Sequence, residues 1–197
     1  MKAPRRSRDE IPIVSFSTPK AWMSWLEKNH AKSSGVWLKI AKRASGNPSV
    51  SYEEALDGAL CYGWIDSQKK GYDEEAWLQK FTPRGATSRW SKVNQEKVQR
   101  LIEAGKMRPA GLQAIQRAKQ GGQWAAAYDR QSVAQVPPDL QAEFEAHPKA
   151  RQFFDGLNSV NRYAILYRIQ TAKKSETRAR RIQQFIEMLE NGEKIYP

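Results

Sequence analysis

Two kinds of hydrophobic periodicity follow each other in the first part of the chain. Over residues 18–30 the apolar side chains recur at helical spacing, with Thr18 in the N-cap position and Pro19 at the first helical position. Residues 36–42 alternate apolar and polar side chains, which is typical of a strand that buries one face. The pattern therefore predicts a helix followed by a strand.

A second helix and two further strands are expected in the same region. Ser51 and Glu54 have the spacing of a capping box, and Gly63 suits the left-handed position that ends a helix. Residues 64–69 and 76–82 then alternate in polarity, as two strands joined by a turn. The predicted fold class is α+β: a small, mostly antiparallel three-stranded sheet with helices, followed by a C-terminal helical module.

From Ser88 onward the periodicity is helical. The expected helices cover residues 91–104, 109–120, 139–146, 149–157 and 159–172, with a last helix that Ser175 caps. The run Val136-Pro137-Pro138 is the clearest linker. We therefore expect three parts, namely a disordered basic tail over residues 1–15, an α+β domain over 16–135 and the helical module over 136–197.

The charge of the chain is strongly positive, at +12 over 197 residues, and it is unevenly spread. Lysine and arginine exceed acidic residues over residues 78–108 and again over 149–181. The expected basic surface includes Lys39, Lys42, Lys92, Arg178 and Arg181. Such a surface suits nucleic acid, phosphates or acidic partners, and a solvated helical surface explains the same pattern equally well.

Cysteine and histidine are scarce. A single cysteine, Cys61, excludes an internal disulfide and suits a reducing compartment. Two histidines and one cysteine supply no zinc ligand set, and we expect no metal and no cofactor. No apolar run approaches the ~18 residues that a membrane span needs. We therefore expect a cytoplasmic protein without an integral membrane segment.

Residues that core packing alone does not explain are densest between residues 61 and 94. We expect a polar, aromatic-walled, ligand-binding surface here, formed by Tyr62, Trp64, Asp66, Arg84, Ser88, Arg89, Trp90 and Asn94. Pro83 places Arg84 on a rigid turn, where its guanidinium can meet an anion. A helix start near Ser91 adds free backbone amides, which also favour an anion.

Several of these residues also have a structural role to weigh against ligand binding. Asp66 is either a general base or the structural partner of an arginine such as Arg84. Trp64 and Trp90 either stack a base or sugar ring or belong to the core. Ser91 serves either an anion or simply the helix start. Because no nucleophile or metal ligand set accompanies Asp66, we predict no catalytic residue.

Four runs carry a resemblance to a known family. They are Ala59-Leu60-Cys61-Tyr62-Gly63-Trp64-Ile65-Asp66, then Phe81-Thr82-Pro83-Arg84 with Ser88, Trp90, Ser91 and Asn94, next Leu101 with Gly105 and Met107, and finally Ala172-Lys173 with Glu176-Thr177-Arg178 and Arg181-Ile182. With these runs the chain resembles the bacterial YdeI/OmpD-associated, or bacteriocin-protection, family from about Pro19 to Gly192. The resemblance implies a role in protection against bacteriocins and cationic antimicrobial peptides. It brings no catalytic residue and no cofactor.

Three functions from different classes follow. The first is a non-enzymatic bacteriocin-protection or stress-tolerance protein that binds an anionic small ligand or a protein partner. The second is a nucleic-acid-binding protein that uses the basic helices and the N-terminal tail, for which a steep salt dependence is expected. The third is an enzyme acting on a small anionic substrate, for which turnover would depend on pH.

Overall fold

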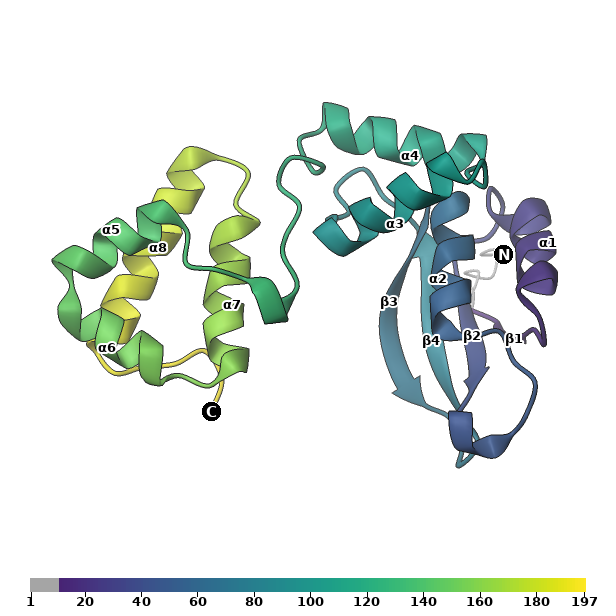
Figure 1. The fold of residues 1–197 in the computed structure, drawn as a ribbon, viewed down its shortest axis with the longest axis horizontal. Coiled ribbons are helices and arrows are strands. Elements are labelled where there is room, and N and C mark those ends of the chain that lie inside the picture. The colour runs from purple at the N-terminus through teal and green to yellow at the C-terminus, as the bar shows by residue number, and fades with distance from the viewer. Residues whose placement is uncertain (1–10) are drawn as a thin grey trace, which may run out of the picture. The chain divides into compact units, whose positions relative to one another are not determined.

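The computed structural model describes residues 11–197, and the chain divides into two compact units (Figure 1). The first unit contains the chain up to Ala86 together with Lys97–Arg117, and the second contains Thr87–Glu96 together with Ala118–Pro197. Residues 1–10 of the predicted basic tail lie outside the described residues. The boundaries predicted at residues 15 and 135 stay a prediction, and the units are described separately below.

The first unit is built on one mixed sheet. Its strands are β1 (Ile13–Ser15), β2 (Val36–Ala41), β3 (Trp64–Gly71) and β4 (Ala76–Pro83), in the order β1-β2-β4-β3. The pairs β2–β4 and β4–β3 are antiparallel, as predicted, and β1 is parallel to β2. All three predicted strands are present, and the sheet contains one more. The sequence did not indicate β1 because this strand is too short to show an alternation and lies in the segment that was expected to be tail.

Two helices of the first unit begin at the predicted caps. In α1 (Pro19–Asn29) the amide of Ala21 donates to Thr18 Oγ1 at 3.2 Å. In α2 (Tyr52–Cys61) both hydrogen bonds of the predicted capping box are present. The Nε1 atom of Trp22 on α1 donates to the Ala55 carbonyl at 2.9 Å, and its ring lies 5.7 Å from that of Phe81 on β4. The core of this unit therefore lies between the sheet and these helices.

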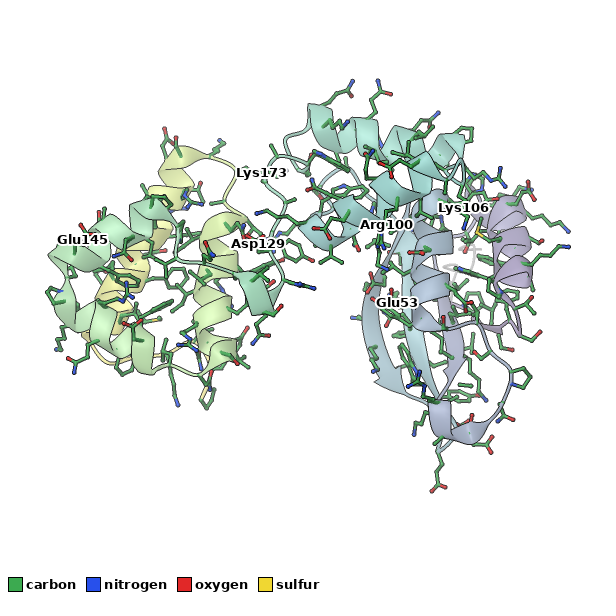
Figure 2. The ribbon with its side chains drawn as sticks, in the orientation of Figure 1. Glu53, Arg100, Lys106, Asp129, Glu145 and Lys173 are labelled. Carbon is green, nitrogen blue, oxygen red and sulfur yellow. The ribbon has the colours of Figure 1, made fainter. Side chains whose placement is uncertain are left out.

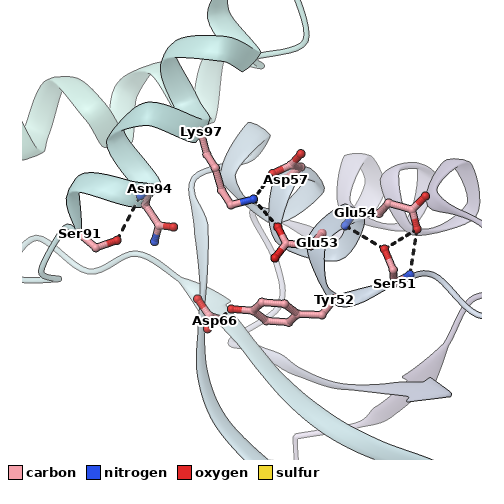
Figure 3. Close-up of polar contacts among 9 residues, drawn as sticks. All are labelled: Ser51, Tyr52, Glu53, Glu54, Asp57, Asp66, Ser91, Asn94 and Lys97. Carbon is pink, nitrogen blue, oxygen red and sulfur yellow. Dashed lines mark hydrogen bonds and ion pairs between the residues drawn. The ribbon is translucent and has the colours of Figure 1, made fainter. Parts of the chain in front are cut away.

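Two more helices follow the sheet, α3 (Lys92–Glu103) and α4 (Pro109–Gln120). Lys97 on α3 forms ion pairs with two carboxylates of α2, those of Glu53 and Asp57 (Figure 3). The start of α4 lies against the end of α2, where the Arg108 amide donates to the Cys61 carbonyl at 3.1 Å. These contacts tie α2 to both of the following helices within the first unit.

The second unit is helical. Its main helices are α5 (Pro138–Ala146), α6 (Pro148–Gly156), α7 (Ser159–Gln170) and α8 (Ser175–Glu190), which surround a core that includes Leu140, Phe144, Phe154, Ile165, Ile169, Ile186 and Leu189. Two short 3₁₀ segments, Arg43–Ser45 in the first unit and Gln131–Val133 in the second, complete the described elements. The prediction that Ser175 caps the last helix was wrong: Ser175 is its first residue, and Lys174 in the cap position makes no capping hydrogen bond through its side chain.

Candidate functional site

The first-unit part of the predicted ligand-binding surface surrounds the end of α2. Tyr62 and Trp64 are both buried. The Nε1 atom of Trp64 donates to the His30 carbonyl at 3.1 Å, and the Tyr62 ring lies 5.0 Å from the imidazole of His30. Of the two roles open for Trp64, the structure therefore assigns the core role. Cys61 is also buried, and burial raises the pKa of its thiol to about 11.

Asp66 and Arg84 lie in the same unit. Asp66 on β3 accepts a hydrogen bond from the hydroxyl of Tyr52 at 2.9 Å (Figure 3). The backbone amide of Arg84 donates to the Gly63 carbonyl at 2.9 Å, and its side chain is buried. Tyr52 comes from the first turn of α2, so this hydrogen bond joins the helix to the edge strand β3. Ligand binding by Asp66 and Arg84 stays a prediction.

The remaining predicted residues belong to the second unit. Trp90 is buried, with its ring 4.9 Å from that of Trp124, so it too has the core role. The Oγ atom of Ser91 accepts from the Asn94 amide at 3.1 Å, which gives Ser91 the geometry of a helix cap (Figure 3). Ser88 and Asn94 are half-buried, and Arg89 is exposed.

Arg89 belongs to a polar pocket of about 320 Å³ in the second unit, which we call the basic pocket. The pocket is lined by three parts of the chain, namely the segment before α3, the segment after α4 and the connection from α7 into α8. Its lining residues are Thr87, Arg89, Gln123, Ala126, Thr171, Ala172, Lys173, Lys174, Thr177 and Arg181. Lys173 is labelled in Figure 2, in the connection between α7 and α8.

All the charged residues that line the basic pocket are cationic. Four of its lining residues are cationic, namely Arg89, Lys173, Lys174 and Arg181. No acidic residue of the described chain lines the pocket. The first turn of α8 adds backbone amides that have no partner within the helix, and the side chain of Lys174 does not cap them; the same turn also carries one carboxylate, that of Glu176, which does not line the pocket. The positive end of the helix dipole lies at the same place. The cationic side chains, the amides and the dipole all favour an anion.

The arginines of the basic pocket are positioned by second-unit neighbours. Arg89 donates through Nη1 to the Tyr167 hydroxyl at 2.7 Å, and its guanidinium lies 5.3 Å from the centre of that ring. Arg181 donates through Nη1 to the Arg168 carbonyl. A guanidinium carries five N–H donors in a planar fork, so these contacts fix the orientation of each group at the pocket.

Gln123 adds a neutral polar group to the basic pocket. The residue is 6% exposed, and its Oε1 atom is buried without a hydrogen-bond partner among the described residues. Buried side-chain amides normally have such a partner. A rotation of the amide would present its NH₂ group instead, which is a donor suited to an anion. Gln123 therefore contributes a side-chain amide whose hydrogen-bonding capacity is not fully used among the described residues.

Most of the predicted basic surface is in contact with acidic side chains or carbonyls. Lys39 pairs with Asp73 at 3.2 Å and Lys42 donates to the Asp73 carbonyl at 3.0 Å, both in the first unit. In the second unit Lys92 pairs with Asp129 at 2.8 Å, and Arg178 contacts both carboxylate oxygens of Asp139. Of the five predicted residues, only Arg181 lines the basic pocket.

Sequence reasoning missed the lysines and threonines of the basic pocket. The available signal was the run Thr171-Ala172-Lys173-Lys174 directly before a helix start, together with Thr177 and Arg181 one and two turns into that helix. Part of this run carries the family resemblance, but it did not suggest a binding site by itself. The contribution of Thr87 and Gln123, which are distant in sequence, had no local signal.

The described part of the chain contains neither a metal-binding cluster of side chains nor a helix suited to span a membrane. No group of three or more His, Cys, Asp or Glu side chains among residues 11–197 is placed to hold a metal ion. None of the helices in that part of the chain is both long enough and apolar enough to cross a bilayer.

Comparison with known families gives two matches. Residues 14–114, slightly more than half of the chain, match the model of a domain of unknown function, DUF8412. Residues 133–192 match the model described as bacteriocin-protection, YdeI or OmpD-associated. The resemblance is therefore confirmed for the C-terminal segment. The N-terminal part of the range over which it was expected, Pro19 to Gly192, matches the DUF8412 model instead. No curated protein and no solved structure matched the chain.

Proposed function

Since the chain belongs to the DUF8412 family and carries a C-terminal bacteriocin-protection segment, we propose that it is a non-enzymatic bacteriocin-protection or stress-tolerance protein that binds a small phosphate-bearing anion in the basic pocket. The observation that carries the proposal is the convergence of four cations on the uncapped start of α8. Lys173, Lys174, Thr177 and Arg181 all lie within the segment that matches the bacteriocin-protection model.

The size and the donors of the basic pocket favour a small anion. Its volume of about 320 Å³ is at the lower end of the range for small-molecule sites. Arginine forks suit the oxygens of phosphate or carboxylate, and a helix N-terminus supplies further N–H donors. The hydroxyls of Thr87 and Thr177 add donors of the same kind, whereas that of Thr171 donates to the Tyr167 carbonyl at 2.7 Å. A phosphate satisfies this set better than a carboxylate because it presents more oxygens to a site with donors on several sides.

The sign of the charge also bears on how such a protein would protect a cell. A protein with a net charge of +12 repels cationic peptides and does not sequester them by charge. Protection would therefore act through an anionic ligand or partner, for which the basic pocket is suited, and not through capture of the peptide itself.

Isothermal titration calorimetry with inorganic phosphate, pyrophosphate and citrate tests the proposal. We expect pyrophosphate or phosphate to bind, and we expect Lys173→Ala/Lys174→Ala and Arg181→Gln each to weaken binding by about tenfold to a hundredfold, because each removes charge-assisted hydrogen bonds worth ~1.5–3 kcal/mol. The matched control is Arg180→Gln, which removes a charge from the neighbouring, exposed position of α8 outside the pocket.

Two outcomes would contradict the proposal. If no anion binds at physiological ionic strength, the basic pocket is not an anion site. If Arg180→Gln weakens binding as much as Arg181→Gln, the effect comes from the overall charge of the surface and not from the pocket. Preferential binding of citrate would keep the pocket but replace phosphate by a carboxylate as its ligand class.

A further inference from the structure

A second surface with an unusual composition lies on the sheet of the first unit. The register pairs Trp37 of β2 with Lys80 of β4, and it places Lys39 of β2 and Lys70 of β3 on either side of Leu78. Residues paired across a sheet point to the same face. With Tyr72, which follows β3, these side chains form what we call the outer sheet face: Trp37, Lys39, Lys70, Tyr72 and Lys80.

The aromatic and cationic side chains of the outer sheet face contact one another. Lys70 Nζ lies 4.3 Å from the centre of the Trp37 ring, and Lys80 Nζ lies 5.8 Å from the same centre. Lys39 Nζ lies 4.5 Å above the Tyr72 ring, and Tyr72 is 50% exposed. The face therefore presents two aromatic rings, each next to a lysine ammonium group.

The opposite face of the sheet is occupied by the rest of the first unit. There Phe81 packs against Trp22 of α1, and Trp77 lies 6.1 Å from Tyr52 of α2. Lys69 Nζ lies 4.3 Å from the centre of the Trp77 ring. Each face of the sheet thus carries a lysine in contact with a tryptophan. Only the outer sheet face adds a second lysine–aromatic contact, that of Lys39 with Tyr72, and a further lysine, Lys80.

This composition fits a ligand that offers negative charge and flat apolar rings together. Lysine ammonium groups that lie over aromatic rings can move to a phosphate while the ring stacks on a base. The ion pair between Lys39 and Asp73 does not prevent this, since both side chains are more than a third exposed and surface pairs of this kind are weak. A duplex hides its bases inside its stack, whereas a single strand exposes them.

We propose that the outer sheet face binds single-stranded nucleic acid, with Trp37 and Tyr72 stacking on bases and with Lys39, Lys70 and Lys80 contacting phosphates. This site is separate from the basic pocket and independent of the anion proposed for it. It also differs from the nucleic-acid hypothesis drawn from the sequence, which used the basic helices and the N-terminal tail.

Fluorescence anisotropy of a labelled oligo-uridine or oligo-thymidine strand with the full chain tests the proposal. We expect Trp37→Leu/Tyr72→Leu to weaken binding at least about tenfold, because base–aromatic stacking contributes strongly to single-strand affinity. Trp77→Leu is the matched control: it removes a tryptophan with the same lysine contact from the opposite face, and it should leave binding unchanged. Trp37→Phe keeps an aromatic ring and should retain most of the affinity.

The dependence of binding on salt separates stacking from charge. Lys70→Gln/Lys80→Gln should lower the slope of log affinity against log salt by about 0.7 for each phosphate that is no longer neutralised. The Lys173→Ala/Lys174→Ala variant should bind the oligonucleotide like the unchanged protein, because those residues belong to the basic pocket. Oligonucleotide binding by this variant therefore tests the outer sheet face independently of whether the basic pocket binds an anion.

The proposal is overturned if the Trp37→Leu/Tyr72→Leu variant binds as tightly as the unchanged protein, since the rings would then make no contact with bases. It is also overturned if a duplex of the same length binds as well as the single strand. Circular dichroism of each variant shows whether the fold is retained. If Trp37→Leu/Tyr72→Leu fails to fold, the salt slope of Lys70→Gln/Lys80→Gln decides instead, and an unchanged slope overturns the proposal.

Discussion

Gly63 connects α2 to β3 in a backbone conformation that favours glycine. Its φ is +72°, and a Cβ atom built on it would lie 2.8 Å from the Ala110 carbonyl oxygen. Gly111 has the complementary role, because its Cβ would lie 2.3 Å from the carbonyl oxygen of Cys61. The two glycines let the end of α2 and the start of α4 approach backbone to backbone.

Replacing Gly63 measures how much this close approach contributes to stability. Gly63→Ala combines a strained left-handed conformation, worth ~1–3 kcal/mol, with a steric clash of similar cost. Gly46→Ala is the matched control, because Gly46 has a φ of +70° but nothing within 4 Å of its Cβ position. Urea denaturation should show a larger loss of stability for Gly63→Ala. Equal losses would show that α4 moves aside at no cost.

The glycines also show what the sequence could and could not reveal at this scale. The left-handed end of α2 was predicted from Gly63 alone, because its signal is local. The density of aromatic and polar residues around it was interpreted as a binding surface, yet Trp64 and Trp90 are buried. The backbone contact of Cys61 with Arg108 depends on how α4 packs, and local periodicity contains no information about that.

At the scale of elements, the predictions succeeded where a cap or a long periodicity is present. The starts of α1, α2 and α4 follow from Thr18, from the Ser51–Glu54 box and from Pro109. They failed at β1, which consists of three residues held by a parallel neighbour, and at the start of α8. A helix without a cap is hard to locate from sequence, and in α8 the missing cap leaves donors for the ligand proposed above.

An ion pair between elements makes the second unit sensitive to acid. Hydrogen bonds from Arg178 on α8 lower the pKa of Asp139 on α5. Because the pKa of Asp139 is lowered in the folded state, the pair stabilises that state fully at pH values above the ordinary pKa of an aspartate. This contribution is lost as the pH falls below that ordinary value and through the lowered pKa. Because the side chain of Asp139 is 45% exposed, the pair is worth only about 0.5–1 kcal/mol.

The variant Asp139→Asn should therefore be less stable than the unchanged protein at pH 7, with the difference shrinking below about pH 4. Denaturant unfolding at several pH values measures this. Asp155→Asn is the control. Asp155 pairs with Arg151 at 2.7 Å, but both residues belong to α6, so this ion pair does not connect two helices. A difference between unchanged protein and Asp139→Asn that does not vary with pH would show that the charge of Asp139 is not the cause.

At the scale of the whole molecule, the two family matches correspond broadly to the two compact units. The DUF8412 match covers the sheet and its helices, and the bacteriocin-protection match covers the C-terminal helices. The second unit also includes Thr87–Glu96, which precedes the first-unit part of α3. Hydrophobic patterning could not predict this exchange of segments, because it is decided by contacts such as that between Trp90 and Trp124, 34 positions apart in sequence.

The C-terminal helices have a hydrophobic core of their own, and we expect them to fold without the rest of the chain. Every buried residue of that core lies between Leu140 and Leu189, and the partly buried residues around it extend from Ala134 to Ile195. A fragment of residues 134–197 should therefore show helical circular dichroism and a cooperative thermal transition. Its size is near the lower limit for a stable domain, so the transition should lie well below that of the full chain.

The loss of stability in this fragment should come from α7. In the full chain Tyr163 donates to the Asp129 carbonyl at 2.8 Å, and the ring of Tyr167 lies 4.8 Å from that of Tyr128. A fragment of residues 118–197 regains both contacts and should melt at a higher temperature than 134–197. If only the longer fragment folds, the predicted boundary at residue 135 is wrong, and the segment before it is part of the helical module, because the aromatic face of α7 needs it for burial.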